Sequence, residues 1–226
     1  KRFMIYVPGV SGFIGKNLVK NLLDKKHTVH AIVRSSTKKD TLDKRVKVYV
    51  FDNDIVKLTT FMSGEKFDGV IHLASLFLAQ HTPENIEELT DSNIFFGTAI
   101  LDASVKSNTS WFINTGTFWQ HYKNKKYSPV NLYAATKQAF EVMAQYYIET
   151  SSINFVTLKL NDTFGPGDTR QKIFNLWMKI STSEEVFPMS PGKQLIHIKY
   201  IDDVVEAYTK VIQAVSKDTQ KKMSGK

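Results

Sequence analysis

The fold is decided by residues 3–15, which have the sequence FMIYVPGVSGFIG. An apolar run at residues 3–7 is typical of a buried strand, and Gly9, Gly12 and Gly15 follow it in the pattern G-x-x-G-x-x-G. Glycines so placed permit a tight turn, close approach of the backbone to a pyrophosphate, and close packing of a helix on the strand. The helix that begins there offers free N–H groups and its positive dipole end to phosphates. The stretch predicts a dinucleotide-binding unit, with a purely structural turn as the alternative.

Strand and helix patterns alternate after this unit. Further apolar runs of strand type occupy residues 28–33, 46–51, 69–73, 110–114 and 153–160. Helical patterns lie at residues 14–25, 55–62, 83–106 and 129–150, with a turn or short helix near 37–42. This alternation predicts an α/β protein with a doubly wound parallel sheet of the Rossmann type, covered by helices on both faces. We expect residues 1–160 to form this dinucleotide-binding domain.

The sequence changes character after residue 160. Residues 161–167 are rich in turn formers, and helical patterns follow at 169–180 and near 202–214. No linker stands out between the two parts. We therefore expect residues 161–226 to be a small substrate-binding portion that is intertwined with the first domain and is incomplete, truncated or partly disordered.

Composition narrows the class of protein. The 226 residues are 42% hydrophobic and contain no cysteine, which excludes disulfides, thiolate metal sites and a cysteine nucleophile. No signal segment precedes the first strand and no apolar run is long enough for a bilayer, so we expect a cytoplasmic protein without a membrane partner. The net charge of +8 comes from scattered lysines without interleaved aromatics, which argues against nucleic acid. It indicates a solvated surface or an anionic ligand.

The end of the second strand indicates which dinucleotide is bound. NAD sites usually carry Asp or Glu there, about 20 residues beyond the glycines. This chain has Arg34 instead, followed by Ser35 and Ser36. A guanidinium matches a 2′-phosphate in fork geometry, and the hydroxyls can add hydrogen bonds. The pattern favours NADP(H), with NAD(H) as the alternative if Arg34 merely faces solvent.

Tyr133 and Lys137 are the candidate proton-transfer pair. They are four residues apart in a helical stretch, so their side chains share one face. An ammonium beside a phenol favours the phenolate, lowers the pKa of the tyrosine and lets it exchange a proton with a substrate hydroxyl. Tyr122 and Lys126 have the same spacing, but they lie in a polar segment where no helix holds them together. We therefore expect the pair at 133 and 137 to be catalytic.

Two threonines precede this helix. Thr115 follows the apolar run 111–114, at the carboxyl end of a predicted strand, where open α/β sheets bind ligands. Thr117 lies two residues on. A hydroxyl at this place can hold the carbonyl or alkoxide oxygen of a substrate, whereas a threonine pair that caps a turn is the alternative.

Taken in order, these motifs resemble the extended short-chain dehydrogenase/reductase family, which contains NAD-dependent epimerases, dehydratases and 4-keto reductases of nucleotide sugars. Further matches are the sequences IHLA at residues 71–74, Asn93 followed by Gly97 and Thr98, FGP at 164–166 and YIDD at 200–203. The resemblance spans most of the chain, and many ordered matches are more specific than any single one.

The resemblance implies roles for individual residues. Asp54 and Ile55 would contact the adenine, Ala74 would line the cofactor cleft, and Asn93 would support the site from its helix. Thr115, Tyr133 and Lys137 would form the catalytic group, with Tyr133 and Lys137 also touching the cofactor. Further cofactor contacts would come from Phe13, Ile14, Leu73 and Ser75, and substrate contacts from Thr117, Asp162, Phe164 and Gly165.

Departures from the family pattern bear on the reaction. The 4,6-dehydratases carry Asp-Glu directly after the catalytic threonine, whereas this chain has Gly116 and Thr117, which argues against dehydration. Arg34 favours a reductase that draws on NADPH over an epimerase that retains NAD, and the sequence resembles most the CDP-sugar 4-keto reductases of the abequose-synthase type. We expect NADPH-dependent reduction of a 4-keto nucleotide sugar, with the epimerase as the alternative. Relatives pair helices 83–106 and 129–150 across a homodimer, which we also expect here. Asp162 stands where much of the family has Asn, so the substrate contact expected there departs from the family pattern.

Overall fold

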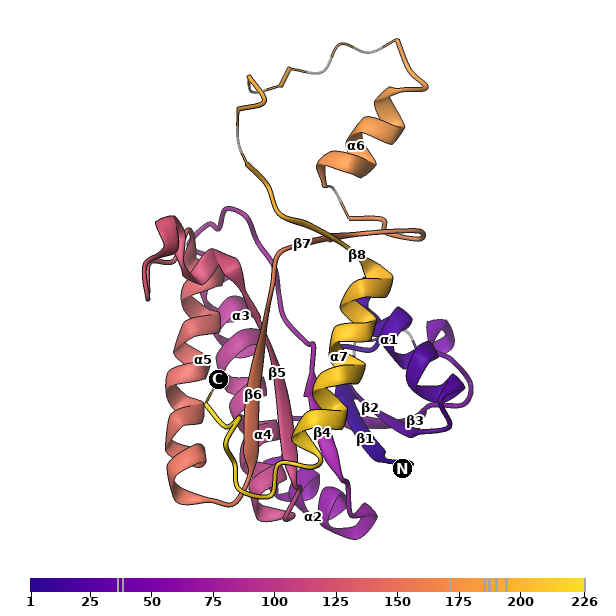
Figure 1. The fold of residues 1–226 in the computed structure, drawn as a ribbon, viewed down its shortest axis with the longest axis vertical. Helices are drawn as coiled ribbons and strands as arrows, with labels where there is room; N and C mark the ends of the chain where they lie inside the picture. The colour runs from indigo at the N-terminus through magenta and orange to yellow at the C-terminus, as the bar shows by residue number, and fades with distance from the viewer. Residues whose placement is uncertain are drawn as a thin grey trace.

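The centre of the molecule is a six-stranded parallel sheet with the strand order β3-β2-β1-β4-β5-β6 (Figure 1). The computed structural model describes the whole chain apart from Ser36, Lys38, Gln171, Glu185, Phe187, Ser190, Gln194 and Lys226. The strands are β1 (Met4–Pro8), β2 (Thr28–Arg34), β3 (Lys47–Phe51), β4 (Gly69–His72), β5 (Trp111–Thr117) and β6 (Asn154–Leu160). The strand order reverses between β1 and β4, which is where such sheets bind ligands. The predicted doubly wound parallel sheet is confirmed.

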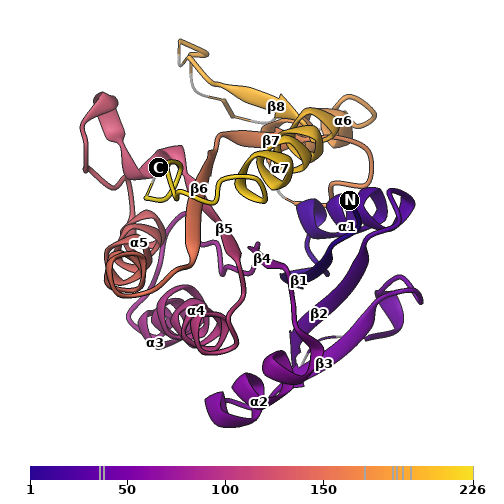
Figure 2. The same ribbon diagram turned by 60° about the horizontal axis from the view of Figure 1, so that its bottom comes forward.

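Helices cover both faces of the sheet (Figure 2). On one face lie α1 (Phe13–Asp24) and α7 (Ile201–Val215), and on the other α2 (Ile55–Glu65), α4 (Phe96–Lys106) and α5 (Leu132–Thr150). Alternate side chains of a strand point to opposite faces. Ile5 and Val7 therefore pack in the core with α1 and α7, and Tyr6 packs in the core with α2. Burial on both faces explains the continuous apolar strands of the sequence.

The predicted helix at residues 83–106 is divided. It consists of α3 (Asn85–Thr90), a π-helical segment η2 (Asp91–Phe95) and α4. A π-helical segment widens the helix by one residue per turn and is frequent at functional sites. Here it buries Ser92 and Asn93. The sequence pattern did not indicate this division.

The C-terminal part returns to the same core. After β6, the chain forms β7 (Asp162–Phe164), which pairs in parallel with β8 (Ile198–Tyr200), and between them α6 (Ile173–Ile180) projects from the body (Figure 1). Helix α7 then packs on α1 and on β5 and β6. The expected helix at 169–180 begins later, because residues before it form a turn. Three short 3₁₀ turns lie between these elements: η1 (Lys39–Thr41), η3 (Phe118–Gln120) and η4 (Tyr122–Asn124).

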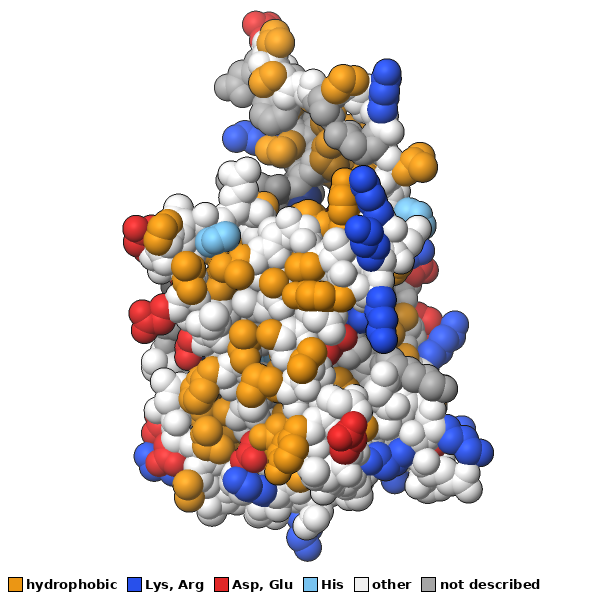
Figure 3. All heavy atoms as spheres, turned by 90° about the vertical axis from the view of Figure 1, so that its left-hand side faces the viewer, with side chains coloured by type: hydrophobic (Ala, Val, Ile, Leu, Met, Phe, Trp, Pro, Cys, Tyr) orange, Lys and Arg blue, Asp and Glu red, His pale blue; other side chains and the backbone are white. Residues whose placement is uncertain are grey.

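One outer face is unusually apolar. Phe95 in η2 and three side chains of α5, Val142, Met143 and Tyr146, are each more than two-fifths exposed. Figure 3 shows hydrophobic side chains gathered on this side of the molecule. In the described parts of the chain, no helix combines the length and apolar character that a bilayer span requires.

Candidate active site

Two adjoining cavities open at the carboxyl ends of the central strands. The first, of about 300 Å³, lies over the glycine turn and the end of β2. The second, of about 340 Å³, is lined by Thr115, Tyr133 and Lys137. Leu73 and Ser75, which follow β4, line both cavities. The two therefore form one cleft across the point where the strand order reverses.

The glycine turn is shaped by close packing at two positions and by open space at the third. Gly9 has a φ of 91°, and a Cβ on it would lie 2.5 Å from the backbone nitrogen of Ala74. A Cβ on Gly15 would collide with the carbonyl oxygen of Gly9. Gly12, in contrast, has an ordinary φ of −72°, and its Cβ would meet protein only at 3.5 Å. Gly12 lines the cleft at the start of α1, so its missing side chain leaves room there for a phosphate group. These residues fit a dinucleotide.

Arg34 lies at the end of β2 and lines the first cavity. Its Nη2 donates a hydrogen bond to Ser92 Oγ at 2.7 Å and lies 3.7 Å from the Asp91 carboxylate. Its guanidinium also lies 5.3 Å from the centre of the Phe96 ring. The side chain is therefore held at the cavity wall by η2 and α4 and does not simply face solvent.

The other residues expected near the adenosine end divide into two groups. Ala74 lines the first cavity, and so does Thr37, which the sequence did not indicate. Ser35 is not among the lining residues, and Ser36 lies outside the described residues. Asp54 and Ile55 also line neither cavity. Asp54 caps α2 by accepting from the Lys57 backbone N–H at 3.0 Å, and Ile55 packs against the core.

Tyr133 and Lys137 lie one turn apart at the start of α5, which Asn131 caps by accepting from the Ala134 N–H at 2.9 Å. Lys137 is only 2% exposed, and both residues line the second cavity. Burial lowers the pKa of Lys137 to about 8, against the opposing effect of Glu141. Burial also raises the pKa of Tyr133, and a hydrogen bond with Ser75 offsets this in part. In the protein alone the pKa of Tyr133 is therefore raised and not lowered as expected, because burial outweighs the hydrogen bond with Ser75.

Asn93 ties three parts of the site together. From η2, its buried Oδ1 accepts from Ser75 Oγ at 3.0 Å and from the Leu76 N–H at 2.8 Å. Its Nδ2 donates to Thr136 Oγ1 in α5 at 2.9 Å. Asn93 thus joins the segment after β4 to the helix that carries Tyr133. This geometry suits the supporting role expected for it.

Thr115 lies within β5 and not beyond its end. The predicted strand stopped at residue 114, but the pairing of β5 with β6 continues to Thr117 opposite Leu160. Both threonines line the second cavity. Thr117 Oγ1 accepts from the Trp119 N–H at 3.2 Å and so caps the turn η3, while Thr115 Oγ1 lies 2.6 Å from the hydroxyl of Tyr208 in α7. The sequence did not indicate Tyr208.

The second Tyr–Lys pair of the same spacing, Tyr122 and Lys126, lies away from the cleft. Tyr122 is in η4 and is more than half exposed, and Lys126 follows in the loop after it. Neither residue lines the cleft. No helix face joins them, as the polar sequence around them predicted.

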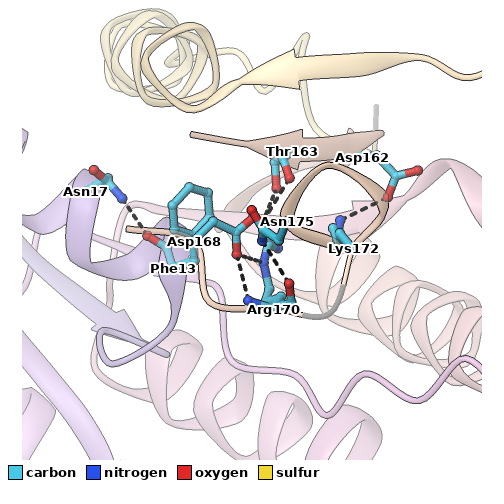
Figure 4. A network of polar contacts seen from close by, with 8 residues as sticks. All are labelled: Phe13, Asn17, Asp162, Thr163, Asp168, Arg170, Lys172 and Asn175. Carbon is cyan, nitrogen blue, oxygen red and sulfur yellow. Dashed lines mark hydrogen bonds and ion pairs between the residues drawn. The ribbon is translucent and has the colours of Figure 1, made fainter. Parts of the chain in front are cut away.

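The outer wall of the second cavity carries an ionic network (Figure 4). Lys172 Nζ lies 2.9 Å from the Asp162 carboxylate, and both residues line the cavity with Arg170. Arg170 donates to the Asp168 carboxylate at 2.6 Å and to the carbonyl of Thr163 at 2.9 Å. Burial alone would raise the pKa of Asp168, but the hydrogen bonds from Arg170 outweigh it and lower the pKa.

Arg170 also reaches the glycine turn. Its guanidinium lies 4.6 Å from the centre of the Phe13 ring, in the first turn of α1 (Figure 4). Phe13 itself lines neither cavity, whereas the adjacent Ile14 lines the second. Arg170 therefore holds the segment after β7 against the start of α1. No sequence pattern indicates this contact, because the two residues are far apart along the chain.

Two residues expected to contact substrate serve mainly in packing. The Phe164 ring packs on Phe174 and Tyr200, with ring centres 5.2 and 5.5 Å away. It lines a neighbouring apolar cavity of about 270 Å³. A Cβ on Gly165 would lie 2.5 Å from Ile201 Cγ2, so glycine there lets α7 begin close to β7.

An aromatic wall that the sequence did not indicate joins the second cavity to the apolar one. Phe77 and Trp119 line both cavities, and their ring centres are 5.6 Å apart. The Phe77 ring also meets the Tyr133 ring edge to face at 5.0 Å. The wall therefore extends from the candidate catalytic tyrosine to the outer opening.

Comparison with known proteins agrees with this architecture. The CDP-abequose synthase of Salmonella typhimurium is 28% identical over 92% of this chain and 70% of its own length. The CDP-abequose synthase of Yersinia pseudotuberculosis is 26% identical over 93% of this chain and 73% of its own. Among solved structures, the UDP-glucose 4-epimerase of Thermotoga maritima with UDP-glucose has a TM-score of 0.80. It is 21% identical, and the match covers 93% of this chain and 73% of that chain.

A second solved structure, WbmH of Bordetella bronchiseptica in complex with NAD⁺, has a TM-score of 0.73 at 19% identity and covers 94% of this chain and 73% of that chain. These structural likenesses concern the fold. The family model described as NAD dependent epimerase/dehydratase matches residues 5–223. That match includes the glycine turn, the Tyr133–Lys137 pair and α7, and it confirms the resemblance seen in the sequence motifs. The chain therefore belongs to the NAD-dependent epimerase/dehydratase family.

Proposed function

We propose that this protein uses NADPH to reduce the carbonyl carbon of a 4-keto nucleotide sugar to a hydroxyl. The observation that carries the proposal is the convergence of Thr115, Tyr133 and Lys137 on a cavity continuous with the space over the glycine turn. The similarity to CDP-abequose synthases supports a CDP-linked sugar as the substrate.

The cofactor would lie along the cleft. Its pyrophosphate would approach Gly12 and the start of α1, and a 2′-phosphate would approach Arg34 and Thr37. Its nicotinamide end would extend past Leu73 and Ser75, the residues shared by both cavities, to Lys137. When bound, the cofactor supplies the hydride that adds to the carbonyl carbon.

Tyr133 acts as the acid in this proposal. As the carbon takes the hydride, the electron pair of the C=O bond moves to the oxygen, which takes the phenolic proton of Tyr133. The raised pKa keeps Tyr133 protonated at neutral pH, and Thr115 donates a hydrogen bond to the same oxygen. Lys137, with a pKa of about 8, carries its charge at pH 7 and stabilises the tyrosinate that remains, which then regains a proton from water.

The same geometry argues against dehydration. A Cβ on Gly116 would lie 2.9 Å from Gln120 Oε1 and 3.0 Å from Glu141 Oε1, and neither Gly116 nor Thr117 carries the carboxylate that removal of water requires. Among the described residues that line the second cavity, Asp162 is the one carboxylate, and Lys172 pairs with it. Lys172 and Arg170, each paired with an aspartate, place hydrogen-bond donors beside the cavity, which suits a nucleoside diphosphate.

An epimerase that works through a transient ketone is the second candidate. It is favoured by the fold similarity to NAD-bound relatives and by the engagement of Arg34 with Ser92 and Asp91, which occupies part of the guanidinium. An epimerase regenerates its cofactor, whereas a reductase consumes NADPH in proportion to product.

The test is to incubate the protein with a CDP-linked 4-ketohexose and NADPH and to follow absorbance of the reduced nicotinamide. Stoichiometric consumption supports the reductase. Interconversion of UDP-glucose and UDP-galactose without consumption supports the epimerase instead. Tyr133→Phe should lose most turnover and still bind NADPH, while Tyr122→Phe, which changes the exposed tyrosine of equal spacing, should remain as active as the wild type.

We further propose a homodimer formed through the exposed face of η2 and α5. Phe95, Val142, Met143 and Tyr146 give this face an apolar character that isolated surface helices rarely have. A second copy packing helix on helix would remove these side chains from water.

A further inference from the structure

Tyr208 is a buried polar residue on the largely apolar inner face of α7, where Thr209 is the other buried polar residue. Its neighbours on that face are Val204, Val205 and Ile212. Tyr208 is 0% exposed, and its hydroxyl lies 2.6 Å from Thr115 Oγ1. Phenylalanine would fill the same space, so packing alone does not call for a hydroxyl at this position. The hydroxyl lies instead directly behind a candidate catalytic threonine.

The direction of this hydrogen bond follows from the chemistry of the two groups. A phenol is a stronger acid than an aliphatic alcohol and hence the better donor. Burial raises the pKa of Tyr208 further, which keeps it protonated, although the hydrogen bond with Thr115 opposes this effect. The 2.6 Å contact allows either hydroxyl to donate, and the greater intrinsic acidity of the phenol favours the arrangement in which Tyr208 donates and Thr115 accepts.

This arrangement determines what Thr115 can offer the cleft. A hydroxyl has one proton, and a Thr115 oxygen that accepts from Tyr208 keeps its own proton for another acceptor. The described residues make no other hydrogen bond to this hydroxyl, and Thr115 lines the cavity next to Tyr133. The proton is therefore available to an acceptor in the cavity, such as a substrate oxygen.

We propose that Tyr208 is a positioning residue that holds the Thr115 hydroxyl as a hydrogen-bond donor to the carbonyl oxygen of the substrate. This inference rests on the proposed function, because Thr115 must face a reacting oxygen. Two donors, Thr115 and Tyr133, then meet the oxygen as negative charge grows on it. Successive hydrogen bonds polarise one another, so the bond from Tyr208 strengthens the donation by Thr115.

The test is a double-mutant cycle between Tyr208→Phe and Thr115→Val, with kcat and KM measured for NADPH and a CDP-linked 4-ketohexose. Tyr208→Phe should lower kcat by about 2- to 13-fold, the effect of one hydrogen bond of ordinary net strength, with an unchanged KM for NADPH. In the Thr115→Val background the same change should cause no further loss. In Thr115→Ser, which keeps a hydroxyl, the loss should return.

Tyr6→Phe is the matched control. Tyr6 is also 0% exposed, but its hydroxyl has no partner among the described residues and lies outside the cleft. Removal of this hydroxyl should leave kcat unchanged. A Tyr208→Phe enzyme with wild-type kcat would overturn the inference, and so would equal losses from Tyr208→Phe in the wild-type and Thr115→Val backgrounds.

A thermal-unfolding cycle separates this inference from the proposed function. If the wild type consumes no NADPH, the reductase is refuted, and UDP-glucose epimerisation becomes the activity measured in the same cycle. If neither substrate reacts, the pairing is judged on the unfolding temperatures of the wild type, the two single mutants and the double mutant. A double mutant less destabilised than the sum of the single mutants supports the pairing, and additive changes refute it.

Discussion

The buried ammonium of Lys137 should destabilise the protein that carries no ligand. The ordinary pKa of 10.5 falls to about 8 in the folded protein, mainly through burial. At 1.36 kcal/mol per tenfold change in the ionisation constant, this difference corresponds to about 3 kcal/mol at pH 7. Lys137→Met keeps most of the side-chain volume and removes the charge. We expect this variant to be inactive. Its free energy of unfolding should exceed that of the wild type by up to about 3 kcal/mol.

The sign of the pH dependence follows from proton binding. Between pH 8 and 10.5 the unfolded lysine still holds its proton while the folded one has lost it, so the stability of the wild type rises with pH relative to the variant. Below pH 8 both states hold the proton, and the full penalty is present. Above pH 10.5 neither does, and the penalty disappears. His72, which also lies near Lys137, has a pKa lowered to about 3 by burial and by Lys137, so it stays neutral over this range.

The assay is urea unfolding of wild type, Lys137→Met and an exposed control, Lys20→Met, at pH 7 and pH 10. The exposed lysine in α1 should change stability by less than about 0.5 kcal/mol at either pH. The excess of the Lys137→Met free energy of unfolding over that of the wild type should shrink by most of its value at pH 10. A Lys137→Met protein less stable than the wild type at pH 7, or an advantage equal at both pH values, would refute the reasoning.

Three further predictions concern the cofactor and the assembly. Gly12→Ala should keep a free energy of unfolding within about 1 kcal/mol of the wild type, because its Cβ meets protein only at 3.5 Å. It should bind NADPH about tenfold more weakly or worse, because the same Cβ enters the cleft. Unchanged affinity by calorimetry would exclude a phosphate there. Arg34→Ala should weaken NADPH binding by about tenfold or more and leave NADH binding within twofold; equal losses would remove the preference for NADPH. Met143→Glu should convert a dimer to a monomer in sedimentation, whereas a wild-type monomer would refute the proposed dimer.

Local patterns carried much of the prediction. The glycine turn, the strands and the helix that holds Tyr133 and Lys137 follow from spacings within a few residues, which backbone geometry translates directly into shared faces. The distinction between Tyr133–Lys137 and Tyr122–Lys126 also came from local context, since only the first pair lies in a helical pattern. The ends of the strands and helices were predicted less accurately. Strand β5 reaches Thr117 because β6 continues to pair with it, and no pattern within β5 could show that.

The amino-acid sequence by itself determined the order of strands and helices and the residues that meet the cleft from within one element, because these depend on neighbours along the chain. Only the tertiary structure decided which distant groups meet. Tyr208 reaches Thr115 across 93 positions, and Arg34 reaches Ser92 across 58. Such contacts depend on how helices dock on the sheet, and the side chains involved look like ordinary core or surface residues until that docking brings them together.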